Sequence, residues 1–493
     1  MKKRVCLLLL AFCLLLSACA PAYQAGADVV PEPGESGEPH EESDSEVPSA
    51  SGEQHTEPDV EVPSASGEQR TEPDAEVPST SETVPMPELS ERDRNWINDI
   101  HYLQDHYKKY HPDPFYLCPE EEFDRKIDWL CQNVDSLSGN DIYFELAAIL
   151  AGMGDIHTHI SPPDSLYNDF FPIGVSYFDG RMYLRFYLEG YEQFEPYLLR
   201  EIVAVNGVDI SYLEQKFENV IHPDNTWASR EIFCAYYFIP AFFDWAGCSY
   251  QDGYTFQILD ENQKVQSIEV PLVSYAEYNA AQVIFPESWA YLFDAEEGNR
   301  AEYREGDNGG YVYMNLEQMD SLAEAHYREL FEETAGLFQA HPDCGKLVID
   351  LRNNPGGFLK VLDFLREDVQ ILKALSIDQT YVLTGGYTLS AAIGCISLFK
   401  EELNAVTVGE PTGQFTSNFC YRPNMNIVLP QSQLSVSVST DWYEGNNFAG
   451  IVYDEDGKLY PWENTILPDV YIHQDIEDIR QGKDSVLEWI LAQ

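Results

Sequence analysis

The sequence predicts an α/β fold for the C-terminal half of the chain, preceded by a helical unit and a β-rich segment. From Gly310 onward, strand-like and helix-like stretches alternate, which is the pattern of an α/β core. Residues 91–153 instead place apolar side chains at helical spacing, and residues 165–275 contain short strand-like runs. About 400 residues follow the N-terminal region, more than one core usually accommodates, so we expect two or three folded units.

The N-terminus has the features of an export signal with a lipid attachment site. Three basic residues at positions 2–4 precede an uncharged apolar run over 5–16, which is too short to span a bilayer of about 30 Å. The tetrapeptide Leu-Ser-Ala-Cys that ends at Cys19 resembles a bacterial lipobox. We therefore expect removal of residues 1–18 and a lipid anchor on Cys19, at the outer face of the cell membrane or a periplasmic leaflet. An ordinary signal peptide is the alternative.

Residues 19–90 are predicted to be a disordered stalk. They hold 11 of the 29 prolines, one aromatic residue, and 18 acidic residues against one basic residue. A 15-residue unit begins at Glu46, recurs at Glu61 and begins again at Glu76. Such a segment has too little apolar surface to offset the entropy of ordering, and its like charges repel one another.

The folded part is expected to begin with a helical unit over residues 91–164. Ser90 is a suitable N-cap because acidic residues follow it in the first turn. The helical pattern continues until the His-Pro-Asp-Pro sequence at 111–114, and further helices are predicted over 123–130 and 142–150.

Residues 165–280 are expected to form a β-rich segment. Strand-like runs occupy 175–177, 182–187 and 202–205, and the last leads into the turn dipeptide Asn206-Gly207. The sequence over 201–210 resembles the strand–turn segment of PDZ domains, to which a peptide C-terminus adds as a strand. An unrelated β-rich insert is the alternative.

Residues 281–493 are predicted to form the α/β core. Its expected strands cover 311–316, 346–351 and 379–384, and its expected helices cover 321–339, 359–366 and 390–399.

The formal net charge of −55 excludes one class of partner. Residues 91–493 contain 25 basic and 66 acidic residues, so the folded part is acidic as well as the stalk. Such a charge repels the phosphate backbone of nucleic acids. Neutral or basic peptides should therefore associate faster than acidic ones, and salt should weaken this preference.

Two strand-to-helix turns carry residues suited to catalysis. The glycine-rich turn over 350–357 can direct backbone N–H groups at an oxyanion. Ser390 follows a predicted strand, begins a predicted helix and has small neighbours, as a nucleophile requires, and the N–H of Ala391 could bind the tetrahedral intermediate. The alternative is that Ser390 only caps the helix.

At these residues the chain resembles the C-terminal-processing and tricorn-type serine peptidases. These peptidases have a ClpP/crotonase-like core, usually with a PDZ domain and a helical N-terminal region. The resemblance covers most of 91–493, and its landmarks stand in the family's order at 154–158, 201–210, 350–357, 388–392, 408–413 and 463–469. It implies a serine peptidase without a cofactor.

The expected general base is a histidine and not a lysine. The Ser/Lys branch of these peptidases has a lysine just after the stretch that matches 408–413. This chain has Gln414 there, and it has no lysine between Lys400 and Lys458. The tricorn-like branch uses a histidine and a late glutamate instead.

The tricorn-like pattern assigns His157 as the base of Ser390 and Glu463 as its support. His157 would take the serine proton and return it to the leaving amine, while Glu463 would fix the imidazole tautomer. Glu444 is a weaker alternative to Glu463. The chain departs from the tricorn pattern at Ile156, where that pattern has a serine.

A metal site is a further alternative. Asp155, His157 and His159 alternate in sequence, and on a strand they would face the same side. The seven cysteines after Cys19 include no CxxC pair, so they predict neither a zinc site nor an evident disulfide framework. We expect no metal.

Together these features predict an exported, membrane-tethered serine peptidase. It would cleave peptides or protein tails through an acyl-enzyme, with oxyanion N–H groups from Ala391 and from Gly356 or Gly357. The alternatives are a non-catalytic lipoprotein that binds peptides or apolar ligands on the same fold, and a metal-dependent hydrolase. The sequence does not indicate an oligomeric state.

Overall fold

The computed structural model describes most of the chain after residue 88. The described residues are 89–221, 224–248, 253–288, 298–306, 309–319, 323–416, 418–420, 426–443 and 466–493. The predictions for Cys19, the stalk, Glu444 and Glu463 lie outside them. Within the described part, no helix is both long enough and apolar enough to cross a membrane.

The helical unit forms as predicted. It contains α2 (Glu91–Tyr110), α3 (Glu120–Asn133) and α4 (Gly139–Ala151). The hydroxyl of Ser90 accepts the N–H of Asp93, and the Asp93 carboxylate accepts the N–H of Ser90, so both ends of a capping box are present. Ser138 and Asp141 form the same motif at the start of α4.

The β-rich segment contains the predicted strands and also helices that were not predicted. Its strands are β2 (Asp169–Phe170), β3 (Ile173–Phe178), β4 (Arg181–Leu188), β5 (Ile202–Val205), β6 (Val208–Asp209), β7 (Tyr254–Leu259), β8 (Val265–Val270), β9 (Val273–Ser274) and β10 (Val283–Ile284). They form sheets in the orders β10-β4-β3, β6-β5-β7-β8 and β2-β9. Asn206 and Gly207 both have positive φ, as a tight β5–β6 hairpin requires.

The unpredicted helices lie mainly between β6 and β7. They are α5 (Ile210–Glu218), α6 (Thr226–Ile232), α7 (Pro240–Phe243) and, after β9, α8 (Tyr275–Ala280). The aromatic residues of this region pack on α4: Trp245 stacks on Phe144, and the hydroxyls of Tyr237 and Tyr143 are 3.0 Å apart. The helical unit and the β-rich segment therefore share one hydrophobic core.

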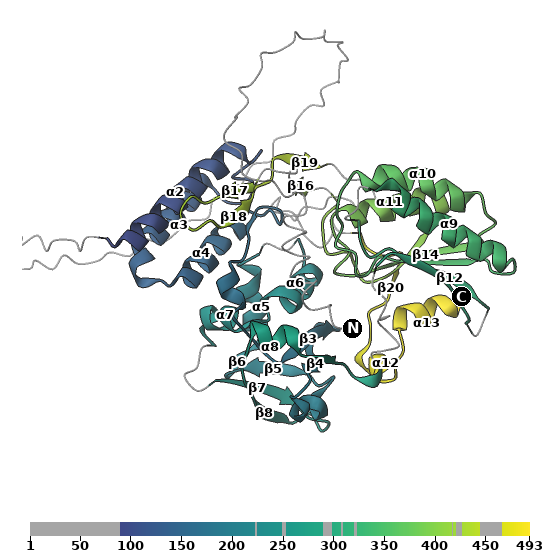
Figure 1. The fold of residues 1–493 in the computed structure, drawn as a ribbon, viewed down its shortest axis with the longest axis horizontal. Coiled ribbons are helices and arrows are strands. Elements are labelled where there is room, and N and C mark those ends of the chain that lie inside the picture. Colours follow the sequence, from purple (N-terminus) through teal and green to yellow (C-terminus); the bar gives the residue numbers. More distant parts are fainter. Residues whose placement is uncertain are drawn as a thin grey trace, which may run out of the picture. The chain divides into compact units, whose positions relative to one another are not determined.

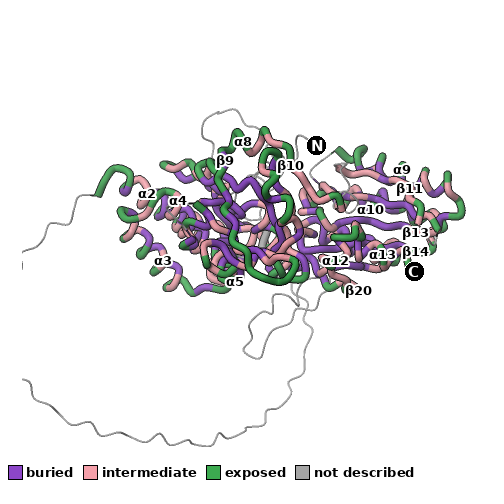
Figure 2. Tube along the Cα trace, turned by 90° about the horizontal axis from the view of Figure 1, so that it is seen from below, coloured by how far each residue is buried: buried purple, intermediate pink, exposed green. Residues whose placement is uncertain are grey.

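The C-terminal half is an α/β core built on one six-stranded sheet. The strand order is β11-β12-β13-β14-β15-β20. The strands are β11 (Arg300–Arg304), β12 (Tyr311–Asn315), β13 (Lys346–Asp350), β14 (Gln379–Thr384), β15 (Val406–Gly409) and β20 (Val470–Tyr471). Only the β11–β12 pair is antiparallel. Figure 2 shows β13 and β14 buried along most of their length, as a sheet covered on both faces requires.

Helices cover the two faces of this sheet. One core cluster joins inward residues of β12, β13 and β14 to α9 (Glu324–Ala340), α10 (Val361–Lys373) and α11 (Ala391–Leu403). Figure 1 shows these three helices together beside the sheet. On the other face, Val348 and Leu383 pack with Val486 and Ile490 of α13 (Ser485–Leu491), which follows α12 (Ile476–Arg480). The alternation of side chains along each strand produces these two cores.

Residues 418–443, which follow β15 of the α/β core, carry short strands, and one of these strands pairs with the end of the helical unit. Strands β17 (Asn426–Val428) and β18 (Ser435–Ser437) pair with β1 (His159–Ile160), while β16 (Asn418–Cys420) pairs with β19 (Asp441–Tyr443). The buried carboxylate of Asp99 on α2 accepts the N–H groups of Gln431 and Ser432. The segment that ends in β1, which carries His157, is thus held against a segment 278 residues later in the chain (His159 pairs with Ser437).

Candidate active site

Ser390 occupies a strained turn between β14 and α11. Its φ is 50° and its ψ is −124°, a combination that an L-residue rarely adopts. The serine stands at the N-cap position, yet its side chain makes no capping hydrogen bond. The alternative that Ser390 only caps the helix is therefore wrong. A serine on a sharp, strained strand-to-helix turn is the arrangement that presents a nucleophilic hydroxyl.

The Ser390 turn is bonded to the glycine-rich turn after β13. The Thr388 hydroxyl donates to the carbonyl of Leu351 at 2.8 Å and accepts the N–H of Gly385 at 3.1 Å. The N–H of Leu389 donates to the carbonyl of Asn354 at 3.0 Å. These buried bonds fix the two turns relative to each other, and so they offset the strain at Ser390.

Gly356 lies directly against Ser390. A Cβ atom on Gly356 would be 2.6 Å from the Ser390 Cβ, 2.7 Å from the Leu389 carbonyl and 2.8 Å from the Ala391 nitrogen. Only glycine permits this approach, and the φ of +95° at Gly356 also favours glycine.

The same contacts narrow the choice of oxyanion donors. The N–H of Gly356 donates to the side-chain oxygen of Asn354 at 2.8 Å, so it is already used within the turn. Of the two predicted glycines, Gly357 is the better partner for Ala391. Ala391 is the first residue of α11, where backbone N–H groups point away from the helix and favour negative charge.

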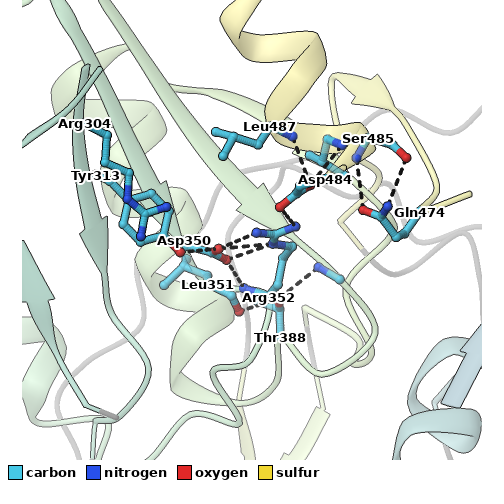
Figure 3. A network of polar contacts seen from close by, with 12 residues as sticks. Arg304, Tyr313, Asp350, Leu351, Arg352, Thr388, Gln474, Asp484, Ser485 and Leu487 are labelled. Carbon is cyan, nitrogen blue, oxygen red and sulfur yellow. Dashed lines mark hydrogen bonds and ion pairs between the residues drawn. The ribbon is translucent and has the colours of Figure 1, made fainter. Parts of the chain in front are cut away.

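A buried ion network supports the glycine-rich turn (Figure 3). Arg352 binds Asp350 at 2.6 Å and Asp484 at 2.8 Å, and the Tyr313 hydroxyl donates to Asp350 at 2.7 Å. Burial would raise the pKa of Asp350, but the Arg352 charge and hydrogen bonds hold it below its ordinary value. Asp484 also caps α13 by accepting N–H groups, so the C-terminal helix is linked to this turn.

His157 lies in a turn and not on a strand. Only His159 and Ile160 form β1, so Asp155, His157 and His159 do not lie together on one strand, as the metal-site alternative supposed. Across the part of the chain that the structure describes, no group of three His, Cys, Asp or Glu residues is arranged to hold a metal ion.

Asp155 instead shapes the His157 turn. One carboxylate oxygen accepts the backbone N–H of His157 at 2.9 Å. The other accepts the Thr158 hydroxyl at 2.6 Å and is 3.2 Å from Nε2 of His111. Burial would raise the pKa of Asp155, but the His111 hydrogen bond and the nearby His157 bring it to about 2.

The carboxamide of Gln414 connects His157 to Ser390. Its Oε1 accepts the backbone N–H of Ser390 at 2.6 Å, and its Nε2 is 3.4 Å from Nε2 of His157. Among the described residues, no direct hydrogen bond joins the Ser390 hydroxyl to the His157 ring. The structure therefore brings the predicted nucleophile and base to the same side chain.

Sequence reasoning located Gln414 but gave it no function. Gln414 was noted only because it stands where the Ser/Lys branch has its catalytic lysine. That place beside the expected nucleophile was the signal that could have marked Gln414 as part of the site. The Gln414 side chain is 2% exposed, so its two contacts are made away from bulk water. Ile156, the departure from the tricorn pattern, packs its side chain against the shared core of the N-terminal half.

Among solved structures, mature CPAF is similar to this chain over nearly the whole length of CPAF. The two are 12% identical with a TM-score of 0.54, and the match covers 81% of this chain and 96% of CPAF. CPAF complexed with lactacystin matches with the same identity and TM-score, over 81% and 97%.

The other comparisons show a weaker likeness or none. The photosystem II D1 C-terminal processing protease is 13% identical over 81% of this chain and 99% of its own, but its TM-score of 0.37 is too low to support an argument. No protein-family model and no curated protein matches the sequence. The chain thus has the mixed α/β fold of CPAF.

Proposed function

We propose that this protein is a serine peptidase that cleaves peptides or protein tails through an acyl-enzyme on Ser390. The observation that carries the proposal is the strained turn that presents Ser390 without using its hydroxyl as a helix cap. Strain of this kind persists only where the surroundings enforce it, and it is concentrated at functional sites.

The surrounding groups fit the steps of acyl transfer. His157 accepts the proton of Ser390 as the hydroxyl attacks the scissile carbonyl, and it then protonates the leaving amine. The N–H groups of Ala391 and Gly357 stabilise the oxyanion. Water then attacks the acyl-enzyme with His157 again as base, which releases the acid product and restores Ser390.

Glu463 is the proposed support for His157. Ile466, three residues later, exchanges two hydrogen bonds with Thr412, two residues before Gln414. Three residues span at most about 11 Å of extended chain, so a glutamate at 463 is within reach of this region.

The proposed location is the outer face of the cell membrane or a periplasmic leaflet, with lipid on Cys19 and the acidic stalk as spacer. The lipobox-like sequence and the repeat of 19–90 support this. The β-rich segment is proposed to accept a peptide as an added strand. The β5–β6 hairpin supports this part of the proposal.

Active-site labelling tests the proposed function. A fluorophosphonate should label the wild-type protein on Ser390 and should fail to label a Ser390→Ala variant. Ser138→Ala is the matched control, because Ser138 also begins a helix but uses its hydroxyl as a cap. Lactacystin, which is bound in one CPAF structure, is a second probe. A folded wild-type protein that neither probe modifies would rule out the proposal.

One observation favours a second candidate, a binding protein without catalysis. Gln414 lies between the base and the nucleophile, and its contacts hold the site in an arrangement without a direct Ser390–His157 bond. A binder would retain peptide with equal affinity in wild-type and Ser390→Ala protein and release no new amine from it. Peptide hydrolysis that Ser390→Ala abolishes would exclude this candidate.

A further inference from the structure

The orientation of the Gln414 carboxamide follows from the chemistry of its neighbours. The backbone N–H of Ser390 can only donate, so the Gln414 atom 2.6 Å from it must be the oxygen. The NH₂ group then faces Nε2 of His157 at 3.4 Å. An NH₂ group can only donate, so the facing nitrogen of His157 carries a lone pair and the ring proton is on Nδ1.

From this we infer that Gln414 is a positioning residue that keeps His157 in its basic, Nε2-unprotonated tautomer beside Ser390. The inference rests on the proposed role of His157 as general base. A neutral donor at Nε2 disfavours protonation there, because an imidazolium would place two N–H groups face to face. At 3.4 Å the contact is long, so a serine hydroxyl can displace it as the reaction begins.

The loop that carries Gln414 is held on both sides of this residue. The buried carboxylate of Asp224 accepts the N–H of Phe415 at 2.7 Å, and the side-chain NH₂ of Asn225 donates to the Thr412 carbonyl at 2.8 Å. These bonds come from the segment before α6, and they fix the backbone on each side of Gln414. The carboxamide is therefore built into the site and is not a mobile surface group.

Other charged groups around His157 come from its own turn and from neighbouring elements. Asp155 and His159 both interact electrostatically with His157, and His111 at the end of α2 contacts Asp155. Asp224 accepts the N–H of Phe415 in the Gln414 loop, and it is close enough to Asp155 for the two charges to interact. All four remain in a Gln414 variant, so they act equally before and after the substitution.

A charge substitution of the same shape tests the inference. In Gln414→Glu, one carboxylate oxygen can still accept the Ser390 N–H, while the other faces His157 and favours the imidazolium. The titration midpoint of the His157 ring, followed by NMR in full-length protein, should rise by about one pH unit or more. The acidic limb of the pH profile of kcat/KM should move to higher pH by the same amount.

Two further variants keep the test sharp. Gln215→Glu adds the same charge on an exposed position of α5 and should leave the His157 midpoint within about 0.2 units, as expected for a screened surface charge. Gln414→Met removes the donor without adding charge and should raise the midpoint by less than Gln414→Glu does. It also serves if the glutamate variant does not fold.

The outcomes separate the inference from the proposed function. A His157 midpoint unchanged in both Gln414 variants overturns the inference, even if the wild-type protein cleaves peptides. A shifted midpoint in a protein that cleaves no peptide supports the Gln414–His157 contact and overturns the proposed function. A shift in the midpoint together with the kcat/KM profile supports both.

Discussion

Ser138 and Ser390 both stand at the start of a helix, but the chain uses them in opposite ways. Ser138 has extended backbone angles, and its hydroxyl accepts the N–H of Asp141 at 3.1 Å. Ser390 has strained angles, and its hydroxyl caps nothing. The first serine stabilises its helix. The second is held by its neighbours in a conformation that only they maintain.

The difference shows where the stabilising interactions of the Ser390 turn lie. They come from Thr388, Asn354 and Gly356 and from the buried ions behind them, and the Ser390 side chain makes no capping hydrogen bond. A side chain that does not cap its own helix is free for chemistry.

Replacing each serine by alanine should separate activity from stability. Ser390→Ala should lower kcat/KM for peptide cleavage by about 10⁴-fold or more, as loss of a nucleophile does, with little change in the free energy of unfolding. Ser138→Ala should leave kcat/KM unchanged and lower that free energy by about 1 kcal/mol. Peptide assays and urea unfolding of both variants provide the measurements. Equal loss of stability in the two would contradict the contrast.

Gly356→Ala should damage the Ser390 turn from outside. Gly190 is a matched control because its φ is also +95°, but nothing lies within 4 Å of an added Cβ there. Gly190→Ala should therefore lower the free energy of unfolding by about 1 kcal/mol, the cost of positive φ alone. Gly356→Ala should lower it by about 3 kcal/mol and reduce activity strongly, because two of its three contacts are with backbone. Similar losses in both variants would show that Gly356 does not press on Ser390.

The carboxyl of Asp224, which holds the loop beside Ser390, should make the free energy of unfolding fall as pH rises. Burial raises the pKa of Asp224 to about 7, although the Phe415 N–H opposes this. Between about pH 4 and 7 the folded protein then binds more protons than the unfolded one, so stability falls as pH rises through this window. Between pH 5 and 8, the free energy of unfolding of the wild-type protein should therefore fall by an amount on the order of 2 kcal/mol because of Asp224. In Asp224→Asn this fall should be absent.

The control for Asp224 lies at the other serine. Asp141→Asn alters the capping box of Ser138 and leaves Asp224 in place, so the decrease in stability with rising pH that Asp224 causes should persist. Unfolding curves at several pH values compare the two variants. If Asp224→Asn kept the wild-type pH dependence of the free energy of unfolding, ionisation of the Asp224 carboxyl would not destabilise the fold.

Glycine at the two positions gives the smallest and most specific test. Ser390→Gly should raise the free energy of unfolding by about 1 kcal/mol, because glycine adopts the strained angles without penalty. Ser138→Gly should lower it by a few tenths of a kcal/mol, since glycine is a tolerable cap. Thermal or urea unfolding should therefore give changes of opposite sign. A loss of stability in both would mean that the Ser390 turn is not strained.

The fold was predictable wherever one segment determines its own structure. The N-cap at Ser90, the Asn206-Gly207 turn and the strand–helix alternation of the α/β core depend on local sequence, and the structure confirms them. Helices α5 to α7 were missed because they are short and are stabilised by aromatic packing within this region, which in turn packs on α4. Periodicity within the segment does not record such distant contacts.

The site divides in the same way. Ser390 and the glycine-rich turn could be recognised because a strand-to-helix turn imposes local residue types. The role of Gln414 could not be recognised from the sequence, because it depends on a contact with His157, 257 positions away, and on a hydrogen bond from the neighbouring Phe415 to Asp224. The strand that the metal-site alternative supposed does not form, because the Asp155 carboxylate accepts the N–H of His157 and the hydroxyl of Thr158 and holds these residues in a turn.

The link from Arg352 to Asp484 has a consequence for how long the site stays assembled. Asp484 caps the start of α13, and that helix packs on the sheet as part of its second core. Local opening of α13 would therefore release Arg352 and loosen the glycine-rich turn that carries the proposed oxyanion donor. The lifetime of the assembled site would thus depend on how often α13 opens, a frequency that amide hydrogen exchange measures.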